Sequence, residues 1–234
     1  YGGIGKWTRE MAVELGSRGH YVHVVTRGDG HDRVDFEDGV WVHRIVPRYF
    51  PEEEKLACDV PDTIRCYALT AHQEVRRIAR HHDIDLVSAP IWDLEGLACL
   101  ADASLRTVVS LHTTFKLMLE SHPEWNCDQN HRLNYIDKMI RAETWVLANA
   151  PWVMANSRGV VNAMRDAYGV ELAAQRLGLV PHGIEDLSAK YAASRRDDVV
   201  RVLFVGRLEK RKGIDLLLQC IPGLCREFPQ LQFV

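Results

Sequence analysis

Apolar residues along this chain follow two alternating periods. Short runs of mostly apolar residues, typical of buried strands, are separated by stretches in which apolar residues recur every three or four positions, as on one face of a helix. The strand-like runs cover residues 20–26, 85–89, 107–111, 152–155 and 177–180. The helical stretches cover residues 6–18, 64–78, 94–103, 133–147 and 157–167. This alternation predicts an α/β fold with a mostly parallel sheet covered by helices on both faces.

Three segments depart from the alternation. Residues 34–45 contain an Asp-Gly pair between two alternating runs, which predicts a β-hairpin. Residues 47–61 are rich in Pro and Glu and are expected to form a loop. Residues 184–198 carry no apolar period and are expected to form an interdomain linker.

A new strand–helix–strand unit begins near residue 201. We therefore expect two Rossmann-like domains with parallel sheets, of which the second is truncated. The first residues are typical of a loop that follows a strand, and residues 231–234 are typical of a strand. We expect the sequence to be a fragment: an N-terminal domain over 1–183 that lacks its first strand, a linker over 184–198, and the start of a C-terminal domain over 199–234.

The composition narrows the class of protein. Of 234 residues, 47% are hydrophobic and 26% charged, as in ordinary globular proteins, and the net charge of −3 gives no electrostatic case for nucleic-acid binding. The six cysteines form no CxxC pair, which favours free thiols in a reducing compartment. No run of about 20 apolar residues predicts a membrane span. We expect a cytoplasmic protein.

The segment 201–213, RVLFVGRLEKRKG, carries the clearest chemical signal. An apolar strand, expected over 202–205, ends in Gly206 and is followed by Arg207, and Lys212 stands where a helix is expected to open. Cations and a helix N-terminus beyond the carboxyl end of a strand favour a bound anion. Ligands of open parallel sheets bind at this edge. The alternative is a solvated basic loop, but the position favours a diphosphate.

Two further segments hold candidate binding residues. Gly2 and Gly3 belong to a glycine-rich stretch before a helix, where backbone can approach a ligand closely. His112 directly follows the strand 107–111, and Thr113 follows His112. A histidine that only packs at the edge of the core is the simpler alternative for His112. Its position at a strand end favours a functional role.

These landmarks, in this order, resemble those of GT-B glycosyltransferases of family 4, a retaining family that uses nucleotide sugars. The resemblance runs along nearly the whole chain. It implies that Arg207 and Lys212 hold the donor diphosphate and stabilise the charge that develops on it. It also implies that Gly2, Gly3 and Gly206 contact the donor. By the same resemblance, His112 contacts the donor sugar and Thr113 contacts the acceptor.

The resemblance carries further expectations about the reaction. The parent protein would transfer a sugar, as a hexosyltransferase-type enzyme, from a nucleoside diphosphate sugar to a glycan, lipid-linked or small-molecule acceptor. No cofactor and no metal would be required. The glutamate pair that the family carries later in its second domain would lie beyond Val234, so we expect the isolated fragment to be inactive.

Other interpretations stay open at this stage. The chain could be a non-catalytic nucleotide-binding or scaffolding module, or a relative of glycogen or sucrose synthases. A P-loop ATPase is a more distant alternative, because Trp7 separates Lys6 from Thr8 and leaves no hydroxyl at the expected magnesium position. Peripheral contact with the inner membrane face is also open, through the basic residues of the helix at 6–18.

Some residues near the expected site have ambiguous roles. Asn156 and Ser157 follow one strand, and His182 follows another. Ser157 is equally well explained as a helix cap. The family usually has Asn where this chain has His182, so no role is transferred there. Asp83 and Asp85 resemble a metal motif of a different glycosyltransferase fold, but their place at the start of a strand favours a structural role.

Overall fold

The computed structural model describes residues 2–51, 54, 56–184, 186 and 199–234. Within the expected linker, 184–198, only Ile184 and Asp186 belong to the described residues. The chain divides into two compact units, Tyr1–His182 and Gly183–Val234, and each is described by itself.

In the part of the first unit that the structure describes, the strands form two sheets. The larger sheet has the order β4-β5-β6-β7 and all its pairs are parallel. Its strands are β4 (Val87–Pro90), β5 (Thr107–Leu111), β6 (Trp152–Ala155) and β7 (Leu177–Leu179). Because all four run in the same direction, the residues that follow them gather at one edge. This confirms the parallel arrangement expected from the strand–helix alternation.

The smaller sheet has the order β1-β3-β2. Its strands are β1 (His23–Arg27), β2 (Arg33–Glu37) and β3 (Val40–Ile45). β1 pairs with β3 in parallel, and β2 pairs with β3 antiparallel. The connecting residues Asp38 and Gly39 have φ of 50° and 82°, the left-handed conformation that an Asp-Gly turn of this type requires. The expected hairpin is confirmed.

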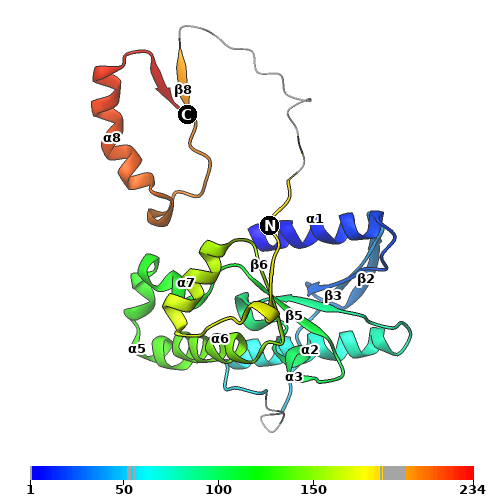
Figure 1. Ribbon diagram of the computed structural model, residues 1–234. Helices are drawn as coiled ribbons and strands as arrows, with labels where there is room; N and C mark the ends of the chain where they lie inside the picture. Colours follow the sequence, from blue (N-terminus) through cyan, green and yellow to red (C-terminus); the bar gives the residue numbers. More distant parts are fainter. Residues whose placement is uncertain (1, 52–53, 55, 185, 187–198) are drawn as a thin grey trace. The chain divides into compact units, whose positions relative to one another are not determined.

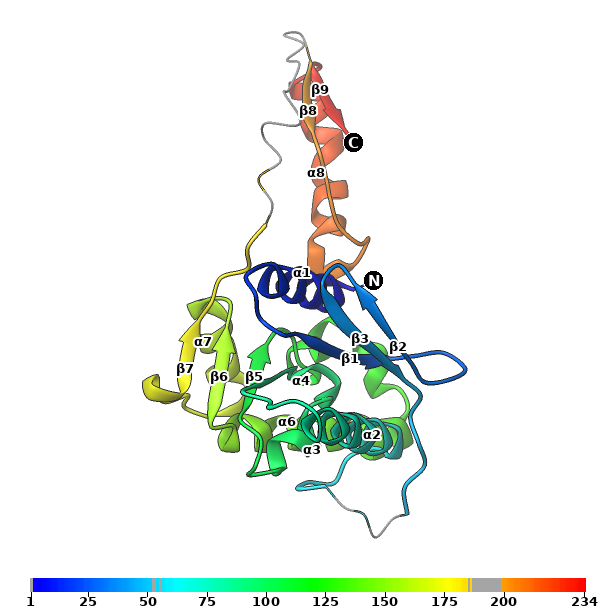
Figure 2. The ribbon, with the colours of Figure 1, turned by 90° about the vertical axis from the view of Figure 1, so that its right-hand side faces the viewer.

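Helices cover both sides of these strands, as Figures 1 and 2 show. Helix α1 lies on one side, and α2, α3 and α6 lie on the other. The helices of this unit are α1 (Gly3–Ser17), α2 (Asp62–Ala79), α3 (Leu97–Ala101), α4 (Phe115–Met118), α5 (Gln129–His131), α6 (Asp137–Asn149) and α7 (Arg158–Tyr168). Short 3₁₀ turns lie at Trp92–Leu94, Leu119–Ser121, Pro123–Asn126 and Ala174–Arg176, and a π-helical turn at Arg132–Ile136.

Two helix ends show why the sequence folds locally as it does. α1 stops before Gly19, whose φ of 89° suits glycine. α7 begins at a true cap, because the Ser157 side chain accepts the Val160 N–H at 3.2 Å. It ends at Gly169, in the left-handed conformation. The capping interpretation of Ser157 is therefore confirmed.

The core lies between the larger sheet and the helices on its α2, α3 and α6 side. Its largest fully buried apolar side chains come from the segment after β4, from β5, from α3, from the π-helical turn before α6, and from α6 and α7: Ile91, Leu94, Leu97, Leu111, Ile136, Met139, Leu147 and Met164. Several of them, among them Leu111, Ile136 and Leu147, belong to the apolar runs and stripes from which the sequence predicts strands and helices. Burial of apolar side chains is the main force that drives folding.

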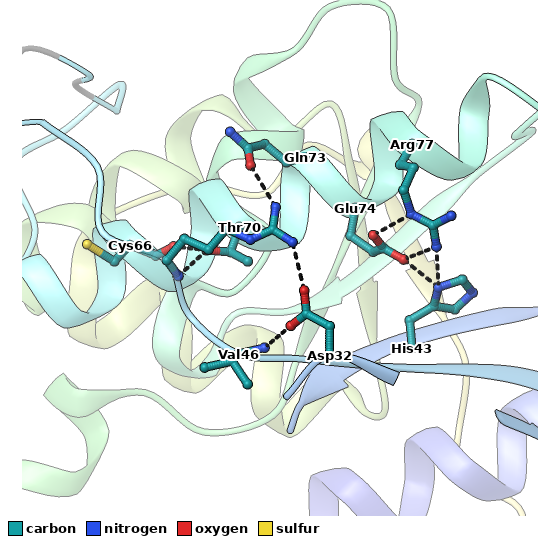
Figure 3. Close-up of polar contacts among 9 residues, drawn as sticks. Asp32, His43, Val46, Cys66, Thr70, Gln73, Glu74 and Arg77 are labelled. Carbon is teal, nitrogen blue, oxygen red and sulfur yellow. Dashed lines mark hydrogen bonds and ion pairs between the residues drawn. The ribbon is translucent and has the colours of Figure 1, made fainter. Parts of the chain in front are cut away.

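A chain of polar side chains joins the smaller sheet to α2 (Figure 3). His43 of β3, only 3% exposed, has its Nδ1 atom 2.6 Å from Glu74 Oε1, and Arg77 also binds Glu74. On the other side of the His43 ring, Nε2 lies 2.8 Å from Nδ1 of His23. Burial and the nearby His43 lower the pKa of His23 to about 4. Nearby in Figure 3, Asp32 accepts the Val46 N–H at 2.7 Å.

The described residues of the second unit form a two-stranded parallel sheet and one α-helix. These are β8 (Val200–Val202), β9 (Leu231–Phe233) and α8 (Ile214–Glu227), with a 3₁₀ turn at Lys210–Lys212. The strand expected over 202–205 is wrong in its bounds: it begins two residues earlier and ends three residues earlier. β8 pairs with β9, and beyond the two strands the Phe204 N–H donates to the Val234 carbonyl oxygen at 3.0 Å. Leu203 and Val205 are exposed.

None of the described helices is both long and apolar enough to cross a membrane. In α1, the cations considered for peripheral membrane contact have acidic partners within the chain. Lys6 pairs with Glu10, Arg9 with Asp38, and Arg18, the residue after the helix, with Glu14.

Candidate active site

The parallel sheet brings strand-end residues from three places in the sequence to one edge. His112 and Thr113 follow β5, Asn156 follows β6, and His182 lies three residues after β7. The first turns of α1 reach the same edge, because Trp7 of α1 contacts both histidines. Ligands of α/β proteins bind beyond the carboxyl ends of parallel strands, so this edge is the candidate site of the first unit.

Three rings form the centre of this edge. The Trp7 ring lies edge-on to the His112 ring with 4.9 Å between centroids, and its centroid lies 5.7 Å from that of His182. The centroids of the two histidines are 5.7 Å apart. Asn156 Nδ2 lies 3.5 Å from His182 Nε2. We call Trp7, His112 and His182 the ring cluster.

His112 is held in a neutral state. It is half-buried, and its Nε2 atom lies 3.2 Å from the Ser110 hydroxyl oxygen. Burial, and after it the charge of nearby His182, lowers the pKa of His112 to about 4. At neutral pH the imidazole can therefore donate one hydrogen bond and accept one, without carrying charge.

The glycine-rich segment differs from the expected loop. α1 begins at Gly3 and not at residue 6, so Gly3 to Gly5 form its first turn and Gly2 is the residue before it. Gly2 has φ of −76°, which other residues adopt equally well. A Cβ atom added at Gly2 or Gly3 would meet no atom of the described chain within 4 Å. Neither backbone strain nor internal packing explains these glycines.

Sequence reasoning missed one member of the ring cluster and left another open. Trp7 lies one helical turn after Gly3, and its spacing with Met11 and Leu15 assigned it only to the packing face of the helix. His182 received no role because the resembling family usually has Asn there. The signal available for Trp7 was its place in the first turns of a helix that starts beside a sheet edge. Thr113, next to His112, is half-buried at the same edge.

The other predicted site residues belong to the second unit. Arg207 has a 74% exposed side chain, and its Nε atom lies 2.7 Å from Glu209 Oε1. Lys212 is exposed, and its side chain lies beside Gly206: a Cβ atom added at Gly206 would be 4.0 Å from Lys212 Cγ. Within the described residues no ion pair of Lys212 is found. Glu209 is a residue that the sequence pattern did not single out.

The start of α8 also differs from the expectation. The helix begins at Ile214, after a 3₁₀ turn that includes Lys212. Gly213 stands between the two with φ of 73°, a conformation that glycine adopts at little cost. Lys212 therefore lies just before the helix, on the turn that leads from Gly206 into it. The predicted site residues thus form one group in each unit.

Among the described residues, no three or more His, Cys, Asp or Glu side chains form a group that could hold a metal ion. The independence of the reaction from metals and cofactors stays a prediction.

Comparison with solved structures identifies the architecture. The chain is similar over its full length to 65% of sucrose-phosphate synthase from Thermosynechococcus elongatus, with a TM-score of 0.62 and 18% identity. It is also similar over its full length to 61% of an E. coli protein solved with UDP-2-fluoro glucose and described as trehalose-6-phosphate, with a TM-score of 0.59 and 12% identity. These likenesses show the GT-B fold, as expected.

Residues 1–186 match the family described as Glycosyltransferase Family 4, and the chain belongs to this family. Among curated proteins it is 28% identical over 244 residues to D-inositol 3-phosphate glycosyltransferase of Kineococcus radiotolerans, covering 97% of this chain and 53% of that protein. A shorter match, 36% identical over 58 residues, is to human phosphatidylinositol N-acetylglucosaminyltransferase, in one of its subunits, and covers 25% of this chain and 12% of that protein. The chain spans about half the length of the curated relatives that it matches along its length.

Proposed function

We propose that the whole protein is a retaining glycosyltransferase that moves a sugar from a nucleoside diphosphate sugar to a hydroxyl-bearing acceptor. The observation that carries the proposal is the ring cluster, a neutral His112 held between Trp7 and His182 at the ligand-binding edge of the sheet. Membership of the family supports the reaction class.

His112 would contact the donor sugar. A neutral imidazole can hydrogen-bond a sugar hydroxyl, and it costs less to bury beside an uncharged sugar than an imidazolium would. Trp7 covers one edge of the His112 ring and restricts its orientation. Thr113, the next residue, would meet the acceptor. Such fixed placement of reacting groups accounts for a large share of the rate in reactions of two substrates.

Arg207 and Lys212 would hold the diphosphate. Arg can clamp two phosphate oxygens, and Lys adds a compact charge to the leaving group as its bond to the sugar breaks. The Glu209 carboxylate forms an ion pair with the Arg207 guanidinium group. A bound diphosphate would therefore replace Glu209 as the partner of Arg207. The exposure of Lys212 leaves its ammonium group available for the same ligand.

The acceptor is proposed only by class. Two of the relatives are named for D-inositol 3-phosphate or phosphatidylinositol, which are hydroxyl-rich compounds. We propose a hydroxyl acceptor of glycan, lipid-linked or small-molecule type. Relatedness to sucrose-phosphate synthase is shown at the level of fold alone.

The test is a donor screen on the whole protein. UDP-, GDP- and ADP-sugars are titrated by calorimetry, and the donor that binds is then incubated with candidate acceptors while NMR follows the anomeric configuration. Binding of one donor and a product with retained configuration support the proposal. A folded protein that binds no nucleotide sugar contradicts it and favours the scaffolding alternative.

The P-loop alternative finds no support in the geometry. Lys6 pairs with Glu10 at 3.5 Å along the helix surface, and residues 3–5 form a helical turn, whereas a P-loop wraps its backbone amides around phosphates. ATP binding that is lost in the variant Lys6→Ala would be the evidence in favour of the P-loop alternative.

Gly3, the first residue of α1, allows a test in which one substitution should have opposite effects on stability and on activity. Gly3→Ala should keep or slightly raise stability, because Ala is favoured over Gly in helices by up to about 1 kcal/mol and the new methyl group has room. The same methyl group should obstruct a ligand that approaches the backbone, and kcat/KM should fall about tenfold or more. Thermal unfolding and initial rates measure the two effects.

The matched control is Gly223→Ala in α8, where an added methyl group likewise meets no atom within 4 Å. It should leave kcat/KM unchanged. Full activity in Gly3→Ala would show that no ligand approaches this turn.

A further inference from the structure

A carboxylate lies in the core, within reach of the loop that carries His112. Glu143 of α6 is 0% exposed. It occupies a position of the apolar stripe of its helix, between Ile140 and Leu147. Removing a carboxylate from water is costly unless hydrogen bonds replace the lost solvent. The partners of this carboxylate therefore indicate why it is there.

Both oxygens of Glu143 have short, well-defined partners. Oε1 accepts the backbone N–H of Phe115 at 2.7 Å, and Oε2 accepts the Tyr168 hydroxyl at 2.6 Å. Burial raises the pKa of Glu143 to about 7, while hydrogen bonds from Tyr168 and from the backbone of Phe115 and Lys116 oppose this rise. The carboxylate thus satisfies amides in the first turn of α4 that no helical carbonyl could reach.

These amides belong to the segment that follows the candidate catalytic residue. Phe115 is the third residue after His112, and the intervening Thr114 is 0% exposed. The Thr114 side chain also caps α4 by accepting the Leu117 N–H at 3.3 Å. On its other side the loop leaves β5 at Leu111, which is 1% exposed. The two-residue stretch of His112 and Thr113 is therefore fixed at both ends.

We propose that Glu143 is the positioning residue of this site: its carboxylate anchors the first turn of α4 and thereby sets the direction in which His112 and Thr113 face the substrates. The inference rests on the proposed function for its link to catalysis. The anchoring itself is testable without turnover.

A purely structural role makes a different prediction. Replacing a buried carboxylate by an apolar side chain of similar volume is often neutral or stabilising when only packing matters. The tests therefore compare Glu143→Met, which fills the space but accepts no hydrogen bond, with Glu143→Gln, whose carbonyl oxygen can still accept the Phe115 N–H.

The first measurement is kinetic, in the whole protein with its donor and acceptor. Glu143→Met should lower kcat by about 10²-fold, because a small displacement of a positioned group has effects of that size. Its donor KM should change much less than its kcat, since the residues proposed to hold the diphosphate, Arg207 and Lys212, lie in the second unit. Glu143→Gln should recover most of the lost kcat. Equal activity of Glu143→Met and the wild type overturns the proposal.

The second measurement needs no enzymatic activity. NMR titration of His112, assigned by comparison with His112→Gln, should show a pKa near 4 in the wild type and in Glu143→Gln. In Glu143→Met the released loop should expose the ring, and its pKa should rise by about one unit or more toward the ordinary value. A folded Glu143→Met with an unshifted His112 overturns the proposal, even if the protein proves not to be a transferase.

Two control variants separate anchoring from general destabilisation. Tyr168→Phe removes one hydrogen bond of Glu143 but leaves the Phe115 N–H bonded, so kcat should change less than about threefold. Met139→Ala creates a cavity one turn earlier on α6 and removes no hydrogen-bond partner of Glu143, so it should lower the Tm without shifting the His112 pKa. A His112 shift in Met139→Ala as large as in Glu143→Met would overturn the specific role of Glu143.

If Glu143→Met does not fold, amide hydrogen exchange in the wild type decides. The Phe115 amide stands in the first turn of α4 and has no backbone acceptor there, so without Glu143 it would exchange rapidly. Strong protection of this amide supports the anchor. Rapid exchange of the Phe115 amide overturns it.

Discussion

Replacing Lys212 with alanine should remove measurable donor binding and lower kcat/KM by about 10³-fold in the whole protein. Groups that stabilise developing charge in a site of low polarity are commonly worth about 10²- to 10³-fold each. Lys212 should reach the upper end, because no described residue neutralises its ammonium group and its stem lies beside Gly206, where a ligand can come close.

Arg207→Ala should have a smaller effect, of about 10²-fold. Arg207 already pairs with Glu209, so part of its interaction with a diphosphate replaces an existing ion pair. The same reasoning predicts that Glu209→Gln strengthens donor binding slightly, since it frees the guanidinium group. Calorimetric titration of the donor and initial rates measure all three variants.

The control for Lys212 is Lys210→Ala. Both lysines are exposed and belong to the same 3₁₀ turn, so the change in net charge is the same. Lys210→Ala should bind the donor within about twofold of the wild type, because an exposed charge at a distance is largely screened by salt. If the two variants lose binding equally, the segment is a solvated basic loop and the diphosphate site lies elsewhere.

The sequence was sufficient to predict those features for which the local sequence signal and the tertiary packing agree. The Asp38-Gly39 turn, the Ser157 cap and the position of His112 after β5 all follow from short-range chemistry, and the structure places each as expected. In a parallel sheet the carboxyl ends of neighbouring strands lie at the same edge, so the residues that follow these strands come close together. For this reason, the edge that holds His112 could be predicted from single strand ends.

Side-chain partners across the fold could not be predicted in this way. Trp7 fits the apolar period of α1. That period does not distinguish a side chain that packs in the core from one that contacts two histidines. Glu143 gave a clearer signal, since a carboxylate in an apolar stripe needs a buried partner. Its partner, the Phe115 N–H, comes from a segment 28 residues away and is known only from the structure.

Element boundaries depended on partners in the same manner. β8 pairs with β9 from Val200 to Val202, a register that the apolar run of β8 does not show by itself. α1 begins at Gly3, within a glycine-rich stretch that intrinsic helix propensity disfavours. That early start places Trp7 one turn into the helix, where it contacts the histidines.

His112→Gln should lower activity and, at the same time, make the protein less sensitive to acid. The amide can replace only part of the hydrogen bonding of a neutral imidazole, so kcat should fall by about 10²-fold. Because the folded-state pKa of His112 is about 4 and the ordinary value is 6.5, the unfolded chain takes up a proton between these pH values and the folded chain does not.

The sign of the effect on stability follows directly. Above pH 6.5 His112 is neutral in both states and contributes no pH dependence. As the pH falls from 6.5 toward 4, protonation favours the unfolded state, so the wild type loses stability in this window. At pH 5 the loss due to His112 should be on the order of 1 kcal/mol once solvent screening of a half-buried group is included. His112→Gln should lack this part of the loss.

His23→Gln is the matched control, because the pKa of His23 is also lowered to about 4 and its ring lies in the polar chain beside His43, outside the ring cluster. It should likewise flatten the acid side of the stability curve while leaving kcat unchanged. Denaturant unfolding at pH 5 and pH 7.5, with rates at pH 7.5, distinguishes the two histidines. If His112→Gln keeps full activity, the ring cluster is a packing feature, and the proposed contact with the donor sugar is wrong.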